Sequence, residues 1–294
     1  MSSSQYKQCI ACGGSLKFFG TRVNYTYVRC LHCKTIQLSP FPTDEELAKA
    51  YSDEYAKSDH YGTNDPEAIF QLSSPFYQAV LHELKQSNLP KGSILDFGCG
   101  WGGMCRYLQV NNYDYLGIDF PSESLEYCKK LSLNISSETL DQLIEKESKY
   151  SAILLITVFE HLNNYAETLE KIAQLLLPGG VLIILIPTAN VYGALGKMWQ
   201  MLRATAELPK LNSTFCPPWH TTIFSTRGMN QLLKQHGFVC DRLLPAPSGK
   251  GNGLKGTIQA IVTILAKVGF RLFGESWFLV PNHIFVYKLK KLNS

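Results

Sequence analysis

Residues 93–103 combine a short apolar run with an unusual density of glycine. The run Ile94–Phe97 predicts a buried strand, and glycines follow it immediately. These are Gly98, Gly100, Gly102 and Gly103. Glycine is needed where φ is positive or where a ligand approaches the backbone too closely for a Cβ atom. The segment therefore predicts a turn whose backbone binds a ligand.

Two acids near this turn distinguish between two kinds of cofactor. The glycines satisfy the G-x-G-x-x-G fingerprint of dinucleotide-binding proteins, and Asp119 ends the next apolar run, where a ribose hydroxyl would be held. Asp96, two residues before the first glycine, would repel a pyrophosphate and attract a cationic centre. S-adenosylmethionine (SAM) carries an ammonium and a sulfonium group and no phosphate. The pair of acids therefore favours SAM over a nicotinamide dinucleotide.

Over roughly residues 66–290 the chain resembles the class I SAM-dependent methyltransferases. The motifs that carry the resemblance are the D-x-G-x-G-x-G loop at 96–102, the strand and acid at 116–120, the strand ending in Glu-His-Leu at 152–162, the turn and strand at 175–187, and the segments at 218–220, 223–225 and 237–238. The resemblance implies an α/β fold with a Rossmann-like, seven-stranded, doubly wound sheet. It also implies the strand order 3-2-1-4-5-7-6, with the last strand antiparallel.

The resemblance further assigns a set of residues to the cofactor. They are Asp96, Gly98, Cys99, Gly100, Gly102, Asp119, Phe120 and Glu160. In this assignment Asp96 lies near the ammonium group, Asp119 accepts bonds from the ribose hydroxyls and Phe120 packs on the adenine. Two structural alternatives are that Asp119 is a helix cap before Pro121 and that Cys99 is a small filler.

Two histidines are candidates for removing a proton from the acceptor. His161 follows Glu160 just beyond the fourth expected strand, and His220 lies in the 217–224 segment that would shape the acceptor pocket. Methyl transfer from a sulfonium is an in-line displacement, so the protein mainly aligns the reactants and excludes water. The alternatives are that His161 is a scaffold for Glu160 and that His220 packs beside Trp219.

Four cysteines near the N-terminus have metal-binding spacing. Cys9 and Cys12 form one C-x-x-C pair, and Cys30 and Cys33 form another, with seventeen residues between the pairs. Two such pairs typically make a closed tetrahedral zinc site, with a hairpin between them. Because about forty residues cannot sustain a core alone, we expect structural zinc to hold this module together.

The elements that must position these residues alternate between helix and strand. Strands are predicted at 16–20, 25–29, 94–97, 115–119, 133–135, 152–157, 181–186, 238–244 and 284–289. Helices are predicted at 44–51, 68–86, 103–111, 122–131, 138–147, 165–177 and 226–236. This pattern predicts a zinc-ribbon module at 1–42, a linker or lid at 43–65 and a methyltransferase domain at 66–294.

An insertion at 245–282 separates the last two expected strands. Its apolar stretch at 257–273 contains Lys267 and Arg271, which makes it too short and too charged to cross a bilayer. The two options are that it packs on the domain and covers the pocket, or that it lies on a membrane surface. We expect packing, and no transmembrane segment.

Composition and charge indicate the cellular compartment of the chain and the charge of its acceptor. Of the 294 residues 45% are hydrophobic, no signal peptide is recognisable, and the nine cysteines are expected as thiols or ligands in a reducing, cytoplasmic compartment. The net charge is +4, of which +5 lies in the first 43 residues. A basic module suits an anionic acceptor or nucleic acid, although it could also be an ordinary solvated surface.

The combination predicts a SAM-dependent methyltransferase of small molecules with structural zinc. It resembles zinc-containing sugar C-methyltransferases, although the chain has no room for the further domain that those enzymes carry, and small-molecule O-methyltransferases. The acceptor is therefore expected among sugars, nucleotide-sugars and glycan or natural-product intermediates. Oxygen, nitrogen and carbon acceptors stay open. One alternative is an RNA methyltransferase that uses the basic ribbon, and another is a non-catalytic protein that binds SAM and zinc.

Overall fold

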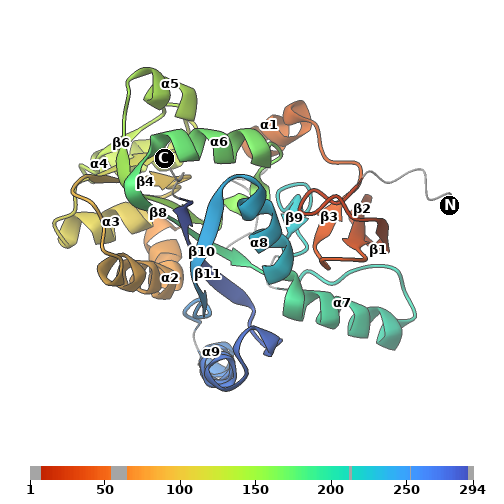
Figure 1. Cartoon of the computed structure of the whole chain (residues 1–294). Coiled ribbons are helices and arrows are strands. Elements are labelled where there is room, and N and C mark those ends of the chain that lie inside the picture. Colours follow the sequence, from red (N-terminus) through yellow and green to blue (C-terminus); the bar gives the residue numbers. More distant parts are fainter. Residues whose placement is uncertain (1–7, 54–64, 212–213, 252, 291–294) are drawn as a thin grey trace.

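A computed structural model describes residues 8–53, 65–211, 214–251 and 253–290 (Figure 1). A seven-stranded sheet forms the centre of the molecule, with helices on both faces, and a smaller four-stranded sheet stands at one side. The boundaries predicted between ribbon, linker and methyltransferase domain stay predictions.

The central sheet has the predicted topology. Its strands are β4 (Ser93–Phe97), β5 (Tyr115–Ile118), β6 (Ile135–Ser136), β7 (Tyr150–Ile156), β8 (Leu176–Pro187), β10 (Phe238–Pro245) and β11 (Asn282–Leu289). Their order is β10-β11-β8-β7-β4-β5-β6, and β11 is antiparallel to both neighbours. Numbered by their place in this sheet, the strands follow the order 3-2-1-4-5-7-6, which confirms the prediction.

Both faces of the sheet are covered, because alternate side chains of its central strands pack in opposite directions. On β7, Ile153 and Leu155 pack with α5, α6 and α8, whereas Ala152 and Leu154 pack with α2, α3 and α4. The helices are α2 (Pro66–Gln86), α3 (Gly103–Val110), α4 (Glu123–Lys130), α5 (Leu140–Glu145), α6 (Tyr165–Leu175) and α8 (Thr226–Gln235). The apolar runs of β7 and β8 follow from burial on both sides.

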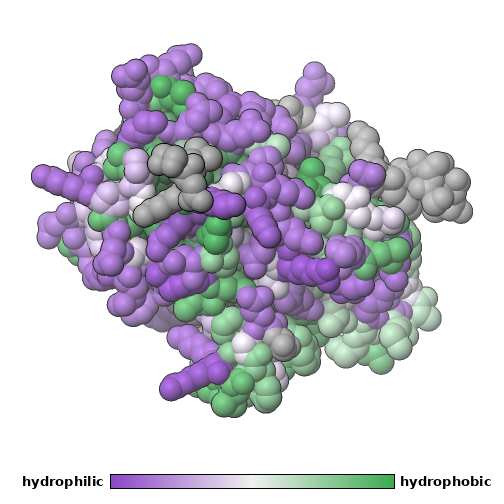
Figure 2. All heavy atoms as spheres, viewed as in Figure 1, coloured by the Kyte–Doolittle hydropathy of each residue, from purple (hydrophilic) through white to green (hydrophobic). Residues whose placement is uncertain are grey.

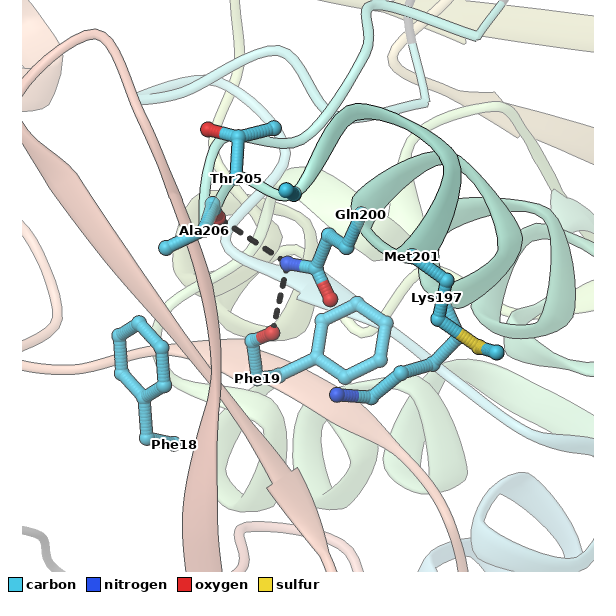
Figure 3. A pocket seen from close by; sticks show the side chains of 8 residues that line it. Phe18, Phe19, Lys197, Gln200, Met201, Thr205 and Ala206 are labelled. Carbon is cyan, nitrogen blue, oxygen red and sulfur yellow. Dashed lines mark hydrogen bonds between the residues drawn. The ribbon is translucent and has the colours of Figure 1, made fainter.

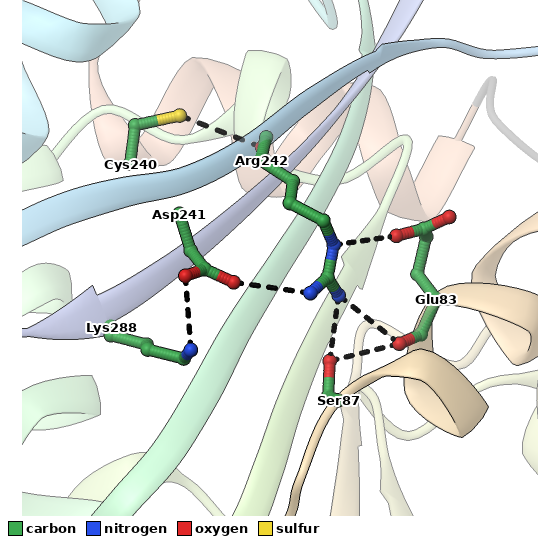
Figure 4. Close-up of polar contacts among 6 residues, drawn as sticks. All are labelled: Glu83, Ser87, Cys240, Asp241, Arg242 and Lys288. Carbon is green, nitrogen blue, oxygen red and sulfur yellow. Dashed lines mark hydrogen bonds and ion pairs between the residues drawn. The ribbon is translucent and has the colours of Figure 1, made fainter.

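An ion-pair network fixes helix α2 against strand β10 (Figure 4). Arg242 Nε lies 2.9 Å from an oxygen of the buried Glu83, and its Nη2 donates to Ser87 Oγ at 2.8 Å. Asp241 pairs with Arg242 at 3.1 Å and with Lys288 of β11 at 3.0 Å. The helix that begins the Rossmann-like body is thereby tied to the two strands that end it.

The cysteine module forms a sheet that borrows a strand from the body. Its strands are β1 (Leu16–Arg22), β2 (Tyr25–Cys30), β3 (Ile36–Leu38) and β9 (Thr222–Ile223), in that order. The predicted hairpin is confirmed, but β3 and β9 were not predicted because two or three residues carry no pattern. Phe19, Tyr27 and Ile36 share a core with Tyr192 and Phe215. The module is therefore packed onto the body.

Helix α7 (Ala189–Arg203), which the sequence did not predict, connects the body to this module. Gln200 Nε2 donates to the carbonyl oxygens of Phe19 at 2.9 Å and of Ala206 at 3.0 Å (Figure 3). A cavity of about 330 Å³ opens there between β1 and α7. It lies away from the glycine turn.

Helix α1 (Asp44–Asp53) begins where it was predicted. Thr43 Oγ1 accepts from the Glu46 amide at 3.1 Å, and the Glu46 carboxylate accepts from the Thr43 amide at 2.7 Å. The pair forms a capping box. Most of the predicted lid, residues 54–64, lies outside the described part of the chain.

The expectation that the apolar stretch of the insertion packs on the domain is wrong. It belongs to helix α9 (Gly253–Phe273), and only 11% of the window Gly256–Phe273 is buried. Among the described residues, α9 is a helix whose length and apolar composition alone would allow it to cross a membrane. Its large aliphatic side chains face away from the body.

Candidate functional site

The glycine turn lies at the carboxyl end of β4, between β5 and β7. Gly98 has φ +77°, and a Cβ atom there would lie 2.5 Å from Val158 Cγ2. Gly100 has φ +50° and open space where a Cβ would be. Gly102, with φ +71°, precedes the first residue of α3. The turn thus has a packed side toward Val158 and an open side at Gly100, and the open side can receive a ligand.

Asp119 follows β5 and points its carboxylate at the glycine turn. Oδ2 accepts from the Gly100 amide at 2.6 Å, and Oδ1 accepts from the Phe120 amide at 2.7 Å. Burial raises the pKa of Asp119, and these two amides oppose the rise. The cap residue of α4 is Ser122, so Asp119 is not the helix cap. Phe120 beside it is 75% exposed, so a planar ligand could reach the face of its ring.

Asp96 lies beneath the turn and is almost fully buried. The Cys105 thiol donates to its Oδ2 at 3.5 Å. Burial raises the pKa of Asp96 to about 7, the Cys105 contact opposes the rise, and the charge of Asp119 adds to it. A cationic ligand above the turn would favour the ionised form. Cys99 is buried against Gly117, and its assignment to the cofactor stays a prediction.

Glu160 is buried without a side-chain partner among the described residues. It lies in the short 3-10 helix η2 (Phe159–His161) that follows β7, and neither carboxylate oxygen has a hydrogen bond. Burial raises its pKa to about 8. A buried carboxyl group without partners is costly, so this group is expected to be protonated until a ligand or a proton acceptor reaches it.

The structure brings His161 and His220 together from separate segments. Their rings meet edge to face with centroids 4.6 Å apart. His220 is buried, and its Nδ1 lies 2.9 Å from the carbonyl oxygen of Thr214. Glu160, His161 and His220 each place a ligand atom within 4.8 Å of the others. Such a set can share a proton or hold a cation.

Sequence reasoning missed the side chains that hold this cluster in place. Thr221 donates its hydroxyl to the Leu162 carbonyl at 2.7 Å, and its amide donates to the Glu160 carbonyl at 3.0 Å. The hydroxyl of the buried Tyr165 lies 3.1 Å from Thr221 Oγ1. The sequence offered one indication of this role, namely that Thr221 is next to His220. A single threonine fits many roles, so its position alone does not predict this one.

The four cysteines of the module converge as their spacing predicts. Their sulfurs lie within 4.8 Å of one another, with Cys9 and Cys33 at 3.6 Å and Cys12 and Cys30 at 3.5 Å. Four thiolates around one zinc ion, at about 2.3 Å each, would be about 3.8 Å apart. The backbone amides of His32 and Cys33 donate to the Cys30 sulfur at 3.3 and 3.4 Å. The residues therefore fit a zinc ion.

Comparison with known proteins gives a family match over most of the chain. A family described as a methyltransferase domain matches residues 71–243. A SAM-dependent methyltransferase from Archaeoglobus fulgidus superposes with a TM-score of 0.52 at 14% identity, over 80% of this chain and 100% of the other. The plantazolicin methyltransferase in complex with SAH gives 0.50 at 18% identity, over 83% and 94%. At these identities the structures support the fold alone.

Curated relatives match shorter stretches. A ubiquinone biosynthesis O-methyltransferase from Chelativorans is 29% identical over 31% of this chain and 38% of its own length. A trans-aconitate 2-methyltransferase from Sinorhizobium fredii is 29% identical over 34% of this chain and 40% of its own length. The chain thus matches about two fifths of the length of each of these two relatives.

Proposed function

Since this chain belongs to the SAM-dependent methyltransferases, we propose that it transfers the methyl group of SAM to a small-molecule acceptor. The observation that carries the proposal is the contact between Asp119 and the Gly100 amide at the carboxyl edge of the sheet. This contact brings an acid to an open backbone turn, with the buried Asp96 in the strand before the turn, and the combination supports a cofactor that has a cationic centre and a ribose.

The residues of this edge have separate roles in the proposal. The glycine turn holds the amino-acid part of SAM near Asp96, and Asp119 accepts bonds from the ribose hydroxyls while Phe120 covers the adenine. SAM supplies an activated methyl group, so the protein aligns the acceptor and excludes water. His161 or His220 removes the acceptor proton, and Glu160 supports the cluster.

We propose a sugar, a nucleotide-sugar or a glycan or natural-product intermediate as the acceptor. The relatives named for ubiquinone biosynthesis and for trans-aconitate support a small-molecule acceptor, and the sugar class rests on the resemblance of the zinc ribbon and body to sugar methyltransferases. The arrangement of the module disfavours the RNA alternative, because Arg22 donates to the Leu208 carbonyl at 2.8 Å and Arg29 is half-buried, with its guanidinium carbon 5.8 Å from the centre of the Phe19 ring. Of the lysines and arginines described in the module, Lys17 and Lys34 are exposed. Two exposed positive charges are few for binding an RNA phosphate backbone.

Calorimetry with SAM, its demethylated product and NAD tests the cofactor. We expect the first two to bind and NAD not to bind. NAD binding without SAM binding would overturn the proposal. Radiolabelled methyl transfer to a ligand that co-purifies with the protein, identified by mass, then tests the acceptor class, and steeply salt-dependent RNA binding would favour the alternative.

A further inference from the structure

Two helices expose most of the large apolar side chains on the surface of the described chain. On α9 the exposed residues are Leu254, Ile258, Ile261, Ile264, Leu265, Val268, Leu272 and Phe273. On the C-terminal half of α7 they are Met198, Trp199, Met201 and Leu202. Both helices lie along the lower edge of the molecule in Figure 1, and hydrophobic spheres gather there in Figure 2. Apolar surface of this extent marks an interaction site.

Helix α9 turns most of its large apolar side chains outward, unlike an ordinary surface helix. On its inward face Thr263 accepts from the Ser248 amide at 3.0 Å, and Ala266 and Gly269 are buried. The larger apolar residues there are the half-buried Val262 and Phe270, and the Phe270 ring lies 6.1 Å from that of His283. Its outward face carries isoleucine, leucine and valine. A helix that only packs on a domain turns its aliphatic face inward, so the outward face of α9 is built for a partner.

Topology places both helices at the edge of the sheet that holds the glycine turn. Helix α7 follows the carboxyl end of β8, and the insertion with α9 follows the carboxyl end of β10. These two strands run in the same direction as β4, because β11 lies antiparallel between them and β8 is parallel to β7. Whatever covers the two helices therefore faces the edge where cofactor and acceptor bind.

Charge distinguishes among the possible partners. Neither helix contains an acidic residue. Their basic residues are Lys197, Arg203, Lys255, Lys267 and Arg271. The aliphatic positions of α9 are spaced three and four residues apart, as in a coiled coil, but two copies would bring basic flanks together without acids to pair with them. An anionic surface is complementary to an apolar stripe with basic flanks.

The helix is placed to lie on a bilayer rather than to cross it. Strands β10 and β11, which precede and follow the insertion, are paired from Phe238 to Pro245. A crossing would require the chain to return within the eight residues 274–281, three of which form η3 (Gly274–Ser276). At about 3.5 Å per extended residue and about 2 Å per 3-10 residue, that segment is shorter than the roughly 30 Å hydrocarbon core.

We propose that α9 and the C-terminal half of α7 dock the carboxyl edge of the sheet on an anionic membrane surface. The acceptor then reaches the site from the lipid–water interface, as a lipid-linked glycan intermediate would. This part rests on the proposed methyl transfer. The apolar stripe enters the headgroup region, and the basic side chains lie at the level of the phosphates.

Co-sedimentation with phosphatidylglycerol vesicles and with phosphatidylcholine vesicles tests the docking. We expect partition onto the anionic vesicles, weakened by salt. Leu265→Glu should lower this partition at least about tenfold, since it puts a charge where the exposed leucine would enter the headgroup region. Lys267→Gln with Arg271→Gln should lower it about tenfold or more, at about 1 kcal/mol per basic residue. The matched control is Val110→Glu on α3, an equally drastic change at an exposed apolar site, which should leave partition unchanged.

Calorimetry of SAM binding, run on the same proteins, separates this inference from the proposed function. SAM binding by a protein that does not partition onto anionic vesicles would overturn the docking alone. Partition without SAM binding would support the docking and contradict the methyltransferase proposal. A concentration-dependent dimer that Leu265→Glu dissociates, without partition by the original chain, would assign the stripe to a second copy and overturn the inference.

Discussion

In the Rossmann-like body, strands buried on both faces position the candidate site, whereas three of the four cysteines lie in turns beside a sheet of short strands. The body has two packed layers of apolar side chains around β7 and β8. The ribbon has a small cluster around Phe19 and Tyr27, and Cys9, Cys30 and Cys33 pack at the margin of one of the body's layers. Substitutions at the glycine edge should therefore act locally, on binding or turnover, whereas loss of one cysteine should act on the folding of the whole ribbon.

The largest effect is expected from Cys30→Ser. The variant should lose the one zinc ion per chain, because a tetrahedral site with three thiolates binds more weakly, and its melting temperature should fall by about 10 °C or more. Elemental analysis and thermal unfolding measure both. Cys240→Ser, at a half-buried cysteine of β10 outside the cluster, should keep the metal. Purified protein without zinc, whose folding resists a chelator, would contradict the prediction.

Next in size is the effect of the histidines on turnover. If His161 is the base, His161→Asn should lower single-turnover methyl transfer about a hundredfold or more and leave SAM affinity nearly unchanged. If it is a scaffold, SAM affinity and thermal stability should fall as well. The same measurement on His220→Asn compares the two, with the exposed His82→Asn as control. Full-rate transfer by both variants would show that the reaction needs neither ring.

A smaller effect is expected on cofactor affinity. Asp119→Ala should weaken SAM binding about tenfold to a hundredfold, because it removes two charge-assisted hydrogen bonds to the ribose. Calorimetry gives the ratio. Asp114→Ala, at an exposed acid just before β5, should bind SAM normally. Undiminished binding by the Asp119 variant would remove that residue from the site.

The smallest expected effect is on the pH dependence of the free energy of unfolding. The pKa of Glu160 is raised to about 8, so between the unfolded pKa near 4.5 and the folded value the native state holds a proton that the unfolded state has released. Stability should therefore fall as pH rises through this window, by at most about 1.4 kcal/mol per pH unit from this group. Urea unfolding of Glu160→Gln should show a shallower fall. The exposed Glu145→Gln should keep the original slope, and equal slopes for all three proteins would contradict the prediction.

Most of the body could be predicted from the sequence, because strongly periodic elements and the motif at 96–102 agree on one topology. The positions of β4, β7 and β8 followed from apolar runs that need burial on both faces. The contact between His161 and His220 could not be predicted, since it depends on the path of a loop fixed by backbone bonds at Thr221. The exposure of α9 was mispredicted because an apolar helix usually packs inward, and composition does not show which way it turns.

Strand β9 has a consequence for the inheritance of this architecture. It belongs to the body in sequence and to the ribbon in hydrogen bonding, since Ile223 pairs with Ile36 and Thr222 with Gln37. It also follows His220 by only one intervening residue. A recombination event that exchanged the first forty residues for another module would remove three strands of a four-stranded sheet and leave a segment next to the histidine pair without its partner. The ribbon and the acceptor side of the site should therefore pass between genes as one unit.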